Sequence, residues 1–391
     1  MMERVAIAPR DDWEQTAEQL GFRFASIDGD VYWDESAYYR FSLNAVEQEI
    51  EEPTEEIHQM CLDLVDRVVR SEAMLTRLQV PETYWDLVCN SWKNGDPHLY
   101  GRMDFSFDPQ SGRAKFLEYN AQTPTSLYET AYFQWVWLDQ LIERGILPGS
   151  TDQFNSLQEK LVGVLNQQMP RLGRNPLYFA CCKDTEEDLG TVDYFRSCAV
   201  AAGLTTGFSY VEDIGIDEQG RFTDINDMTI PAIFMLYPLE FMFEEKFGPY
   251  LGKNDTLLYE PSWKAILSNK GILPLLWEQH KGHPNLLPSY FADQIPGDDI
   301  GHSFVHKPIF SREGANISVM ENGEEVAYAE GPYDDSGFII QKTHPLPVFA
   351  GNHTLIGSWV VGDKAAGMSI REDDSIITRD TSRFVPHVIM D

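Results

Sequence analysis

Two short segments place arginine, carboxylate and amide side chains at the spacing that suits a metal ion beside a phosphate. In GRMDFSFD (101–108), Arg102 and Asp104 are two residues apart, and in AKFLEYN (114–120), so are Glu118 and Asn120. Side chains two apart on a strand share one face. If the strands pair with Asp104 opposite Glu118, Arg102 lies opposite Asn120 and all four crowd together.

Two carboxylates and an amide oxygen are the hard ligands that Mg²⁺ prefers beside substrate phosphates. Arg102 adds a planar cation for a phosphate or a carboxylate. The alternative is a solvated sheet face on which an arginine merely pairs with a carboxylate, as is common at protein surfaces.

The surrounding residues predict that these two segments form a β-hairpin. Apolar Met103, Phe105 and Phe107 alternate with the polar residues, and the turn cluster DPQSG (108–112) separates the two runs. Alternation on both sides of such a cluster is the usual hairpin pattern.

A second group of residues suits a nucleotide. In HKPIFSREGAN (306–316), Lys307 leads from a predicted strand into a loop that contains Ser311, Gly314 and Asn316. Small residues let backbone N–H groups approach phosphate oxygens, and the lysine reaches the same anion. The alternative is an ordinary glycine turn between strands.

The remaining pattern predicts an α+β chain, with helices earlier and antiparallel strands later. The spacing of the apolar residues predicts a helix that begins near Thr54. FIIQK (338–342) is predicted to be a strand whose end suits the binding of an adenine. Arg371 is a further cation on a predicted strand. Helices are also predicted at 11–20, 126–146, 153–168 and from about Thr191, a strand at 176–184, and further strands in FVHKPIFSREGANISVM, GFIIQKTHPL, GSWVVGDKAAGMSIRE and SIITRD.

Length and composition describe a globular protein of two or three packed units, since 391 residues exceed one ordinary core and 43% are hydrophobic. The N-terminal residues lack the apolar stretch of a signal peptide, and no run approaches a membrane span. We therefore expect a cytoplasmic protein with no membrane partner.

The charge and the cysteines exclude other classes of function. A net charge of −32 disfavours nucleic acid and favours metal ions and amines, although it also keeps a protein soluble. The five cysteines form no CxxC pair and have no metal-ligand spacing, which predicts reduced, mostly buried thiols and argues against a zinc site or a redox centre.

The motifs, taken in order, resemble the glutathionylspermidine synthase family, and most closely its stand-alone members described as acid–amine ligases. The resemblance extends from residue 32 to residue 389. It is carried by YGRMDF, LEYNAQTPTSLYE, the EED triplet with Thr191, LYPLEFM, SNKGILPLLW, HPNLLP, KPIFSREGANI and IREDDSIIT.

This resemblance implies a permuted ATP-grasp fold in which the metal-binding strands precede the nucleotide-binding lysines. The domains expected from it are an N-terminal helical region (1–100), the metal-binding hairpin (101–125), a pre-ATP-grasp-like α/β substrate region (126–260) and a nucleotide-binding region (261–391).

The resemblance also implies residue roles. It makes Asp104, Glu118 and Asn120 magnesium ligands, and it sets Arg102 and Arg371 at the reacting groups. It places Lys270 and Lys307 at the ATP phosphates, with Arg312 and Gly314 nearby. It places Gln341 beside the adenine. It places Glu186, Glu187 and Thr191 at the binding site for the acid and the amine. Thr123 and Thr125 occupy the positions at which the bifunctional synthases carry serines that contact glutathione.

The expected activity is an ATP- and Mg²⁺-dependent ligation of a small acid to an amine through an acyl phosphate. The Cys-dependent amidase domain of the bifunctional enzymes has no counterpart here, so hydrolysis of the amide product is not expected. Two other classes stay open: a phosphotransferase that stops after phosphorylating its acceptor, and a nucleotide-binding regulatory module. The identities of the acid and the amine and the oligomeric state are not encoded in any motif.

Overall fold

The predicted hairpin forms two strands of the central sheet. In the computed structural model, which describes residues 2–27, 29–183, 185–312, 314–333, 336–379 and 381–390, β5 (Tyr100–Asp108) pairs antiparallel with β6 (Arg113–Asn120). Asp104 lies opposite Glu118 and Arg102 opposite Asn120, which confirms the predicted register. The register shifts directly after Asp104, so Leu117 is left out of the pairing.

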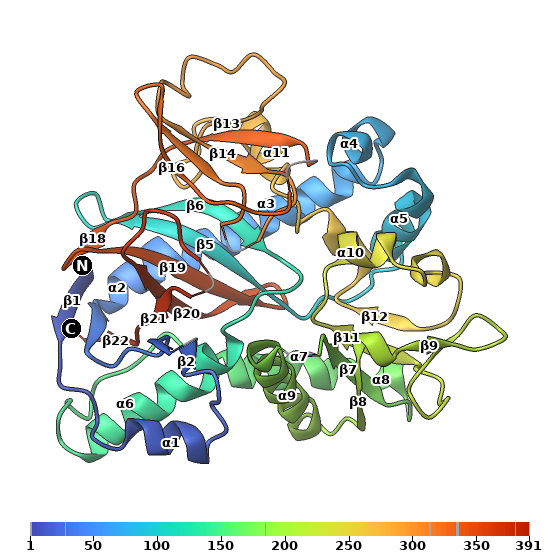
Figure 1. Cartoon of the computed structure of the whole chain (residues 1–391), viewed down its shortest axis with the longest axis horizontal. Helices are drawn as coiled ribbons and strands as arrows, with labels where there is room; N and C mark the ends of the chain where they lie inside the picture. The colour runs from blue at the N-terminus through green and yellow to red at the C-terminus, as the bar shows by residue number, and fades with distance from the viewer. Residues whose placement is uncertain are drawn as a thin grey trace.

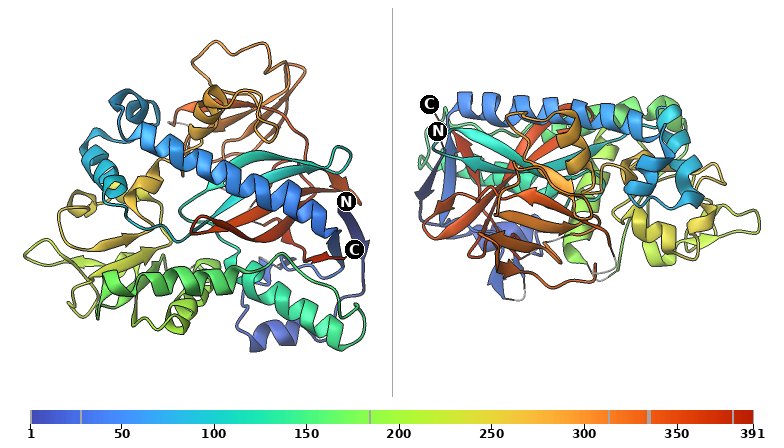
Figure 2. Two further views of the ribbon diagram at one scale, coloured as in Figure 1. Left: turned by 180° about the vertical axis from the view of Figure 1, so that it is seen from behind. Right: turned by 90° about the horizontal axis from the view of Figure 1, so that it is seen from above.

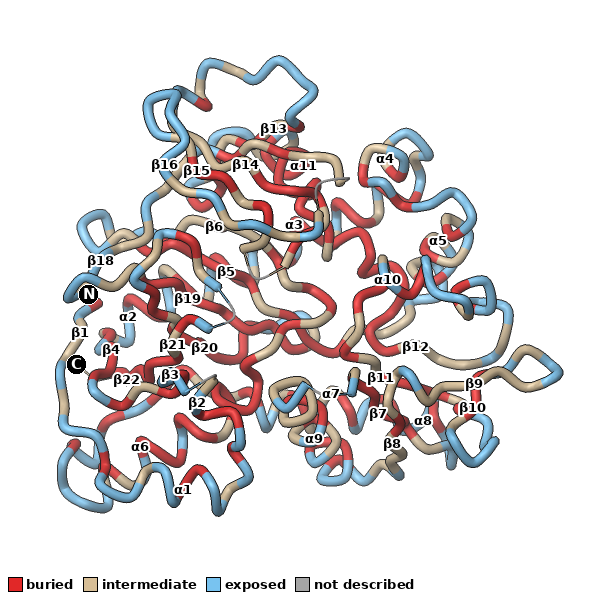
Figure 3. The backbone as a smooth tube through the Cα atoms, viewed as in Figure 1, coloured by how far each residue is buried: buried red, intermediate tan, exposed pale blue. Residues whose placement is uncertain are grey.

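Strands from the C-terminal part of the chain complete this sheet. Its order is β21-β20-β19-β5-β6, and β19 pairs antiparallel with both β5 and β20. The backbone of the sheet is buried along most of its length (Figure 3). The added strands are β19 (Asn352–Val361), β20 (Lys364–Asp373) and β21 (Arg383–Phe384), with β18 (Val348–Phe349) paired to β19.

Helix α3 (Glu52–Val68) covers one face of the central sheet, as Figure 2 shows from behind. It confirms the helix predicted near Thr54, and its apolar positions, from Ile57 to Val68, are buried. Thr54 itself donates from Oγ1 to Ser358 Oγ of β19 at 2.7 Å, which ties the start of the helix to the sheet. The helix is preceded by α2 (Leu43–Val46) and one π-helical turn, η1 (Glu47–Glu51).

A second, five-stranded antiparallel sheet carries Lys307 and Gln341 and lies beside the hairpin (Figure 1). Helix α11 (Ile272–Gln279) packs against it. Its strands, in order, are β13 (Ser289–Phe291), β17 (Phe338–Lys342), β14 (Phe304–Pro308), β15 (Ser318–Glu321) and β16 (Glu324–Tyr328).

A third sheet is parallel and packs against α7 (Leu157–Gln167) and α9 (Glu186–Ala201). The helix predicted from about Thr191 begins at Glu186, because three acidic residues form its first turn, where the helix dipole favours negative charge. The strand predicted at 176–184 ends at Cys181. In order, the strands are β12 (Leu257–Tyr259), β11 (Ala232–Met235), β7 (Leu177–Cys181) and β8 (Thr206–Tyr210).

The two ends of the chain meet in a small sheet, where β4 (Ala37–Phe41) pairs antiparallel with β1 (Met2–Ala6) and parallel with β22 (His387–Ile389). Figure 1 shows the N- and C-termini side by side there. An aromatic cluster joins this region to α1 (Trp13–Gln19) and α6 (Gln134–Glu143), with the Phe22 and Phe133 rings 4.7 Å apart.

The strand predicted over SIITRD (375–380) is wrong for the residues described, 375–379, which form no strand. The Asp373 carboxylate accepts from the backbone N–H of Ser375 at 2.8 Å and pairs with Arg379 at 2.9 Å. One acidic side chain therefore folds this segment into a loop, because it offers the backbone an alternative to strand pairing.

The architecture confirms a mixed α+β chain, while the domain boundaries stay a prediction. Within the described residues, no helix is long and apolar enough to cross a membrane. The remaining α-helices and strands of the described residues are α4 (Glu72–Arg77), α5 (Trp85–Lys93), α8 (Met169–Leu172), α10 (Leu239–Glu244), and the pairs β2 (Ser26–Ile27) with β3 (Asp30–Val31) and β9 (Gly215–Ile216) with β10 (Phe222–Thr223). A π-helical turn, η3 (Glu129–Phe133), precedes α6.

Candidate active site

The carboxylate of Asp104 is held by its neighbours on the hairpin. Arg102 donates from Nε to Asp104 Oδ1 at 2.7 Å and from Nη2 to Oδ2 at 3.2 Å, and Asn120 Nδ2 donates to Oδ2 at 2.9 Å. Asp104 is 3% exposed, and burial raises its carboxyl pKa, although the nearby guanidinium acts in the opposite direction. Its orientation is therefore fixed before any ligand binds.

Glu118 faces two lysines that come from other parts of the chain. Lys270 Nζ lies 3.2 Å from Glu118 Oε2, and Lys307 Nζ donates to the Leu117 carbonyl at 3.1 Å. Burial disfavours the charged carboxylate, but the two ammonium groups outweigh it and lower the pKa of Glu118 to about 2. Burial lowers the pKa of Lys307 to about 8. At neutral pH, Glu118 is ionised and Lys307 is mostly charged.

Neighbouring groups fix both lysines. Lys307 on β14 donates to Gln341 Oε1 of β17 at 2.8 Å, and Gln341 Nε2 donates to the Phe116 carbonyl at 3.3 Å. The Gln341 side chain thus joins the second sheet to the hairpin. Lys270 precedes α11 and donates from Nζ to the Ser311 carbonyl at 2.6 Å, which anchors the loop after β14.

Two cavities adjoin at the hairpin. One, of about 270 Å³, is lined by Lys307, Gln341 and aliphatic side chains such as Val305 and Val319. The other, of about 120 Å³, is lined by polar groups. Both cavities are bordered by Asp104, Glu118, Gly314, Leu355 and Thr378.

The polar cavity brings together most of the predicted substrate-side residues. Glu187, in the first turn of α9, lines it, but Glu186 is exposed and does not. Thr191 is also absent from its lining. It is fully buried within α9, and its hydroxyl has no hydrogen-bond partner among the residues that the structure describes. The other predicted residues on this cavity are Arg102, Asn120, Thr123, Thr125, Arg312 and Arg371.

The loop after β14 closes one side of the polar cavity. Arg312 pairs with Glu240 of α10 and lies 3.5 Å from Thr123 Oγ1. Gly314 has φ +73°, and an added Cβ would lie 2.8 Å from the Thr378 carbonyl. Only glycine fits this backbone comfortably. Glu313 of the same motif lies outside the described residues.

Arg371 on β20 leads to a buried network that sequence reasoning missed. Its Nη1 donates to Ser126 Oγ at 3.1 Å, and the Tyr32 hydroxyl lies 3.1 Å from Ser126 Oγ and donates to Glu129 Oε1 at 2.5 Å. Burial, and then the charge of Glu187, raise the pKa of Glu129 to about 7. SLYE (126–129) has the spacing of a helix-capping box, so its pattern points to a helix start rather than to a site.

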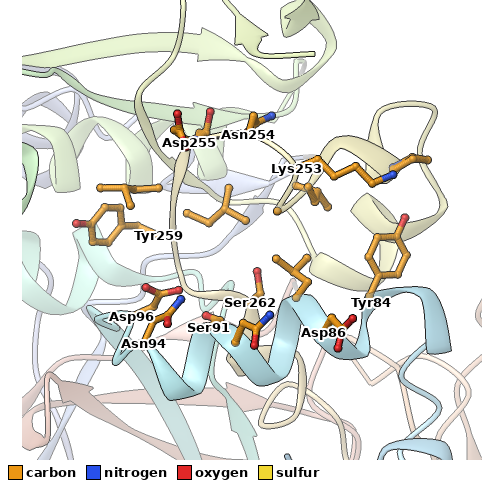
Figure 4. Close-up of a pocket in the computed structure, with 18 of the residues that line it drawn as sticks. Tyr84, Asp86, Ser91, Asn94, Asp96, Lys253, Asn254, Asp255, Tyr259 and Ser262 are labelled. Carbon is orange, nitrogen blue, oxygen red and sulfur yellow. Dashed lines mark hydrogen bonds between the residues drawn. The ribbon is translucent and has the colours of Figure 1, made fainter. Parts of the chain in front are cut away.

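A larger cavity of about 770 Å³ lies elsewhere, between α5 and the segment 249–259. Figure 4 shows Asn254 and Asp255 on one side of it and Ser91 and Asn94 on the other. None of the predicted site residues lines this cavity.

Comparisons with known proteins place the chain in a family. The family described as "Glutathionylspermidine synthase preATP-grasp" matches residues 4–390. A Haemophilus influenzae protein named "Putative acid--amine ligase" is 39% identical over 99% of both chains. Trypanothione synthetase of Crithidia fasciculata is 26% identical over 84% of this chain and 53% of its own length.

One further relative is longer than this chain, and one solved structure shares its fold. The bifunctional glutathionylspermidine synthetase/amidase of Escherichia coli is 23% identical over 97% of this chain, which spans 63% of that enzyme. A solved structure, the apo form of a glutathione synthetase-like effector (GSS30) from Globodera pallida, shares the fold with a TM-score of 0.58, 98% of each chain covered and 11% identity. By its sequence from residue 4 to residue 390, the chain belongs to the glutathionylspermidine synthase family.

Proposed function

We propose that this chain joins a small carboxylic acid to an amine at the polar cavity, using ATP bound in the aliphatic cavity. It is an ATP-dependent ligase that forms a C–N bond, as its family membership supports. The observation that carries the proposal is that the two cavities meet at Asp104 and Glu118. A phosphoryl group at that junction is within reach of a nucleotide on one side and an acceptor on the other.

The chemistry requires activation, because a carboxylate and an amine do not condense at neutral pH. Transfer of the γ-phosphoryl group of ATP to the acid gives an acyl phosphate and ADP, and attack by the uncharged amine then gives the amide and phosphate. Catalysis of phosphoryl transfer is chiefly positioning and charge stabilisation. Lys270, Lys307 and Arg102 surround the junction with positive charge for this purpose.

The residues present fit a magnesium ion at the same place. Asp104, Glu118 and Asn120 offer two carboxylates and an amide on one sheet face, and Glu118 is ionised at neutral pH. When bound, Mg²⁺ neutralises charge on the transferred phosphoryl group. The arrangement of Arg102 and Asn120 around Asp104 holds one ligand in place in advance.

The polar cavity supplies groups of both signs for the two substrates. Arg371 suits the carboxylate of the acid, the Thr123 and Thr125 hydroxyls suit a peptide backbone, and Glu187 suits an ammonium group of the amine. We therefore favour a small peptide of the glutathione type as the acid and a polyamine as the amine. We further propose a permuted ATP-grasp topology and a cytoplasmic location.

The decisive experiment is ADP release by the full chain across a matrix of carboxylates and polyamines, with mass spectrometry of the products. We expect ADP release that needs both substrates and Mg²⁺, together with an amide product. A phosphotransferase would release ADP without any amine, and a regulatory module would bind ATP without release; either result would overturn the proposal. Lys307→Ala should lose most turnover while keeping its fold.

A further inference from the structure

Two histidines and an aspartate lie close together outside the two cavities of the candidate active site. They are His58 of α3, His98 just before β5 and Asp363 in the turn between β19 and β20. His58 Nε2 and His98 Nε2 each lie 3.1 Å from the same oxygen, Asp363 Oδ1. One ligand-type atom from each of the three residues lies within 4.8 Å of the other two.

These separations suit tetrahedral coordination of one small cation. With zinc–ligand bonds of about 2.0–2.1 Å, neighbouring tetrahedral ligand atoms are about 3.3 Å apart. The two nitrogen-to-oxygen distances are already close to that value. Two imidazoles with one carboxylate form a donor set that zinc accepts readily, with water as a fourth ligand.

A backbone hydrogen bond holds the segments of His98 and Asp363 together, and a side-chain contact orients His58. Gly362, with φ +57°, donates from its backbone N–H to the Leu99 carbonyl at 2.8 Å, so the turn that carries Asp363 is bonded to the residue after His98. His58 is 1% exposed, and its Nδ1 lies 3.0 Å from the Tyr119 hydroxyl. A hydrogen bond on the second nitrogen of a ligating imidazole fixes its orientation.

The surroundings leave the site accessible and do not oppose a cation strongly. The Asp363 side chain is 66% exposed, which provides a path for an ion and for water. The ammonium of Lys264 acts on both imidazoles, but it is bonded to Glu260 at 2.6 Å and to the Tyr100 carbonyl at 2.5 Å. The carboxylate of Glu260 offsets its charge locally.

We propose that His58, His98 and Asp363 form a binding site for one zinc ion, separate from the magnesium site of the reaction. The ion joins α3, the start of β5 and the β19–β20 turn, three elements that are distant in sequence. Tyr119 links this site to β6 between Glu118 and Asn120. The site stabilises the sheet that carries the catalytic hairpin and does not touch the substrates.

The test is zinc binding by the full chain after removal of bound metal with a chelator. Zinc is titrated against a chromophoric competitor in the presence of excess Mg²⁺, and thermal unfolding is followed with and without zinc. We expect one tightly bound zinc per chain, a higher midpoint of unfolding with zinc, and a visible spectrum of tetrahedral type when Co²⁺ replaces it.

Asp363→Asn and His98→Gln should each weaken zinc affinity on the order of a hundredfold and abolish the thermal shift. Glu56→Gln is the matched control, since Glu56 is an exposed carboxylate on the same helix, 3.3 Å from the single imidazole of His283. Glu118→Gln controls for zinc in the magnesium site. Two results would overturn the proposed zinc site. One is the same zinc affinity in the wild type, Asp363→Asn and His98→Gln. The other is a loss of zinc binding in Glu118→Gln but not in Asp363→Asn.

Discussion

Glu118 and Glu187 both line the polar cavity, but their surroundings assign them to different steps. Glu118 lies against Lys270 at the junction with the nucleotide cavity, whereas Glu187 lies in the first turn of α9 on the substrate side. Glu118→Gln removes the charge of a proposed magnesium ligand and should lower turnover on the order of a hundredfold or more. Glu187→Gln should instead raise the amine concentration needed for half-maximal rate, because its contact is made equally in ground and transition states.

The measurement is steady-state kinetics of both variants with magnesium and amine varied separately. Full activity of Glu118→Gln at limiting magnesium would remove it from the metal site. A changed magnesium dependence in Glu187→Gln, with an unchanged amine dependence, would show that the two roles are reversed.

Glu129 makes the stability of the protein depend on pH. Burial and then Glu187 raise its pKa from the ordinary value of 4.5 to about 7, so the folded chain binds this proton more tightly than the unfolded chain. The resulting stability is fully present below pH 4.5 and is lost as the pH rises through 7, for a total of about 3 kcal/mol. Glu129→Gln should therefore stabilise the protein more at pH 8 than at pH 5.

Urea unfolding of the wild type and of Glu129→Gln at pH 5 and pH 8 measures the difference. Glu186→Gln serves as the control, since it removes an exposed carboxylate in the first turn of α9, next to Glu187 in the sequence. An equal change in both variants, at both pH values, would contradict a buried proton on Glu129.

The sequence allowed a correct prediction of the register that groups several candidate residues of the site, because two adjacent segments carry them. Arg102, Asp104, Glu118 and Asn120 meet because strand parity alone brings them to one face. Tyr32 and Glu129 could not be linked in this way. Glu129 begins the π-helical turn η3 (Glu129–Phe133) before α6 and is 97 residues from Tyr32, and the packing of two such distant segments has no local signature.

At the scale of elements, local chemistry decides which predictions hold. The hairpin and α3 were predictable because an alternating or helical period agreed with the turn and first-turn residues around it. The segment 375–379 was not, since its apolar residues suggest a strand while Asp373 captures its backbone. The start of α9 was misplaced because an acidic run indicates a loop as readily as a first helical turn.

Gly314 tests whether the loop after β14 needs its close approach to Thr378. Gly314→Ala should cost about 1 kcal/mol for the positive φ and a further 1–3 kcal/mol for the contact with the Thr378 carbonyl. Because the displaced loop borders both cavities, the KM for ATP should rise as well.

Gly323 is the matched control, with φ +88° and nothing within 4 Å of an added Cβ. Gly323→Ala should show only the backbone cost and a normal KM. Urea unfolding and ATP kinetics of the two variants measure these effects. An equal loss of unfolding free energy in Gly314→Ala and Gly323→Ala would contradict the contact with Thr378.

At the scale of the whole molecule, the net charge of −32 opposes the folded state through self-repulsion. Raising NaCl from about 20 mM to about 300 mM shortens the Debye length and should raise Tm by a few degrees. Parallel thermal scans in KCl check that the effect is one of ionic strength. A fall in Tm would show that exposed ion pairs such as Arg70–Asp66, which salt screens, outweigh the repulsion.

The pairing of β5 with β19 has a consequence for the order of events on the ribosome. Asp104 and Gly357 pair in the sheet, but the ribosome must translate the whole segment between them before β5 and β19 can meet. At 5–20 residues per second this delay is roughly 10–50 s. Through that interval the β5 edge that later pairs with β19 has no partner strand. A nascent chain stalled just before β19 therefore exposes an aggregation-prone strand edge beside a candidate site that still lacks Arg371 of β20.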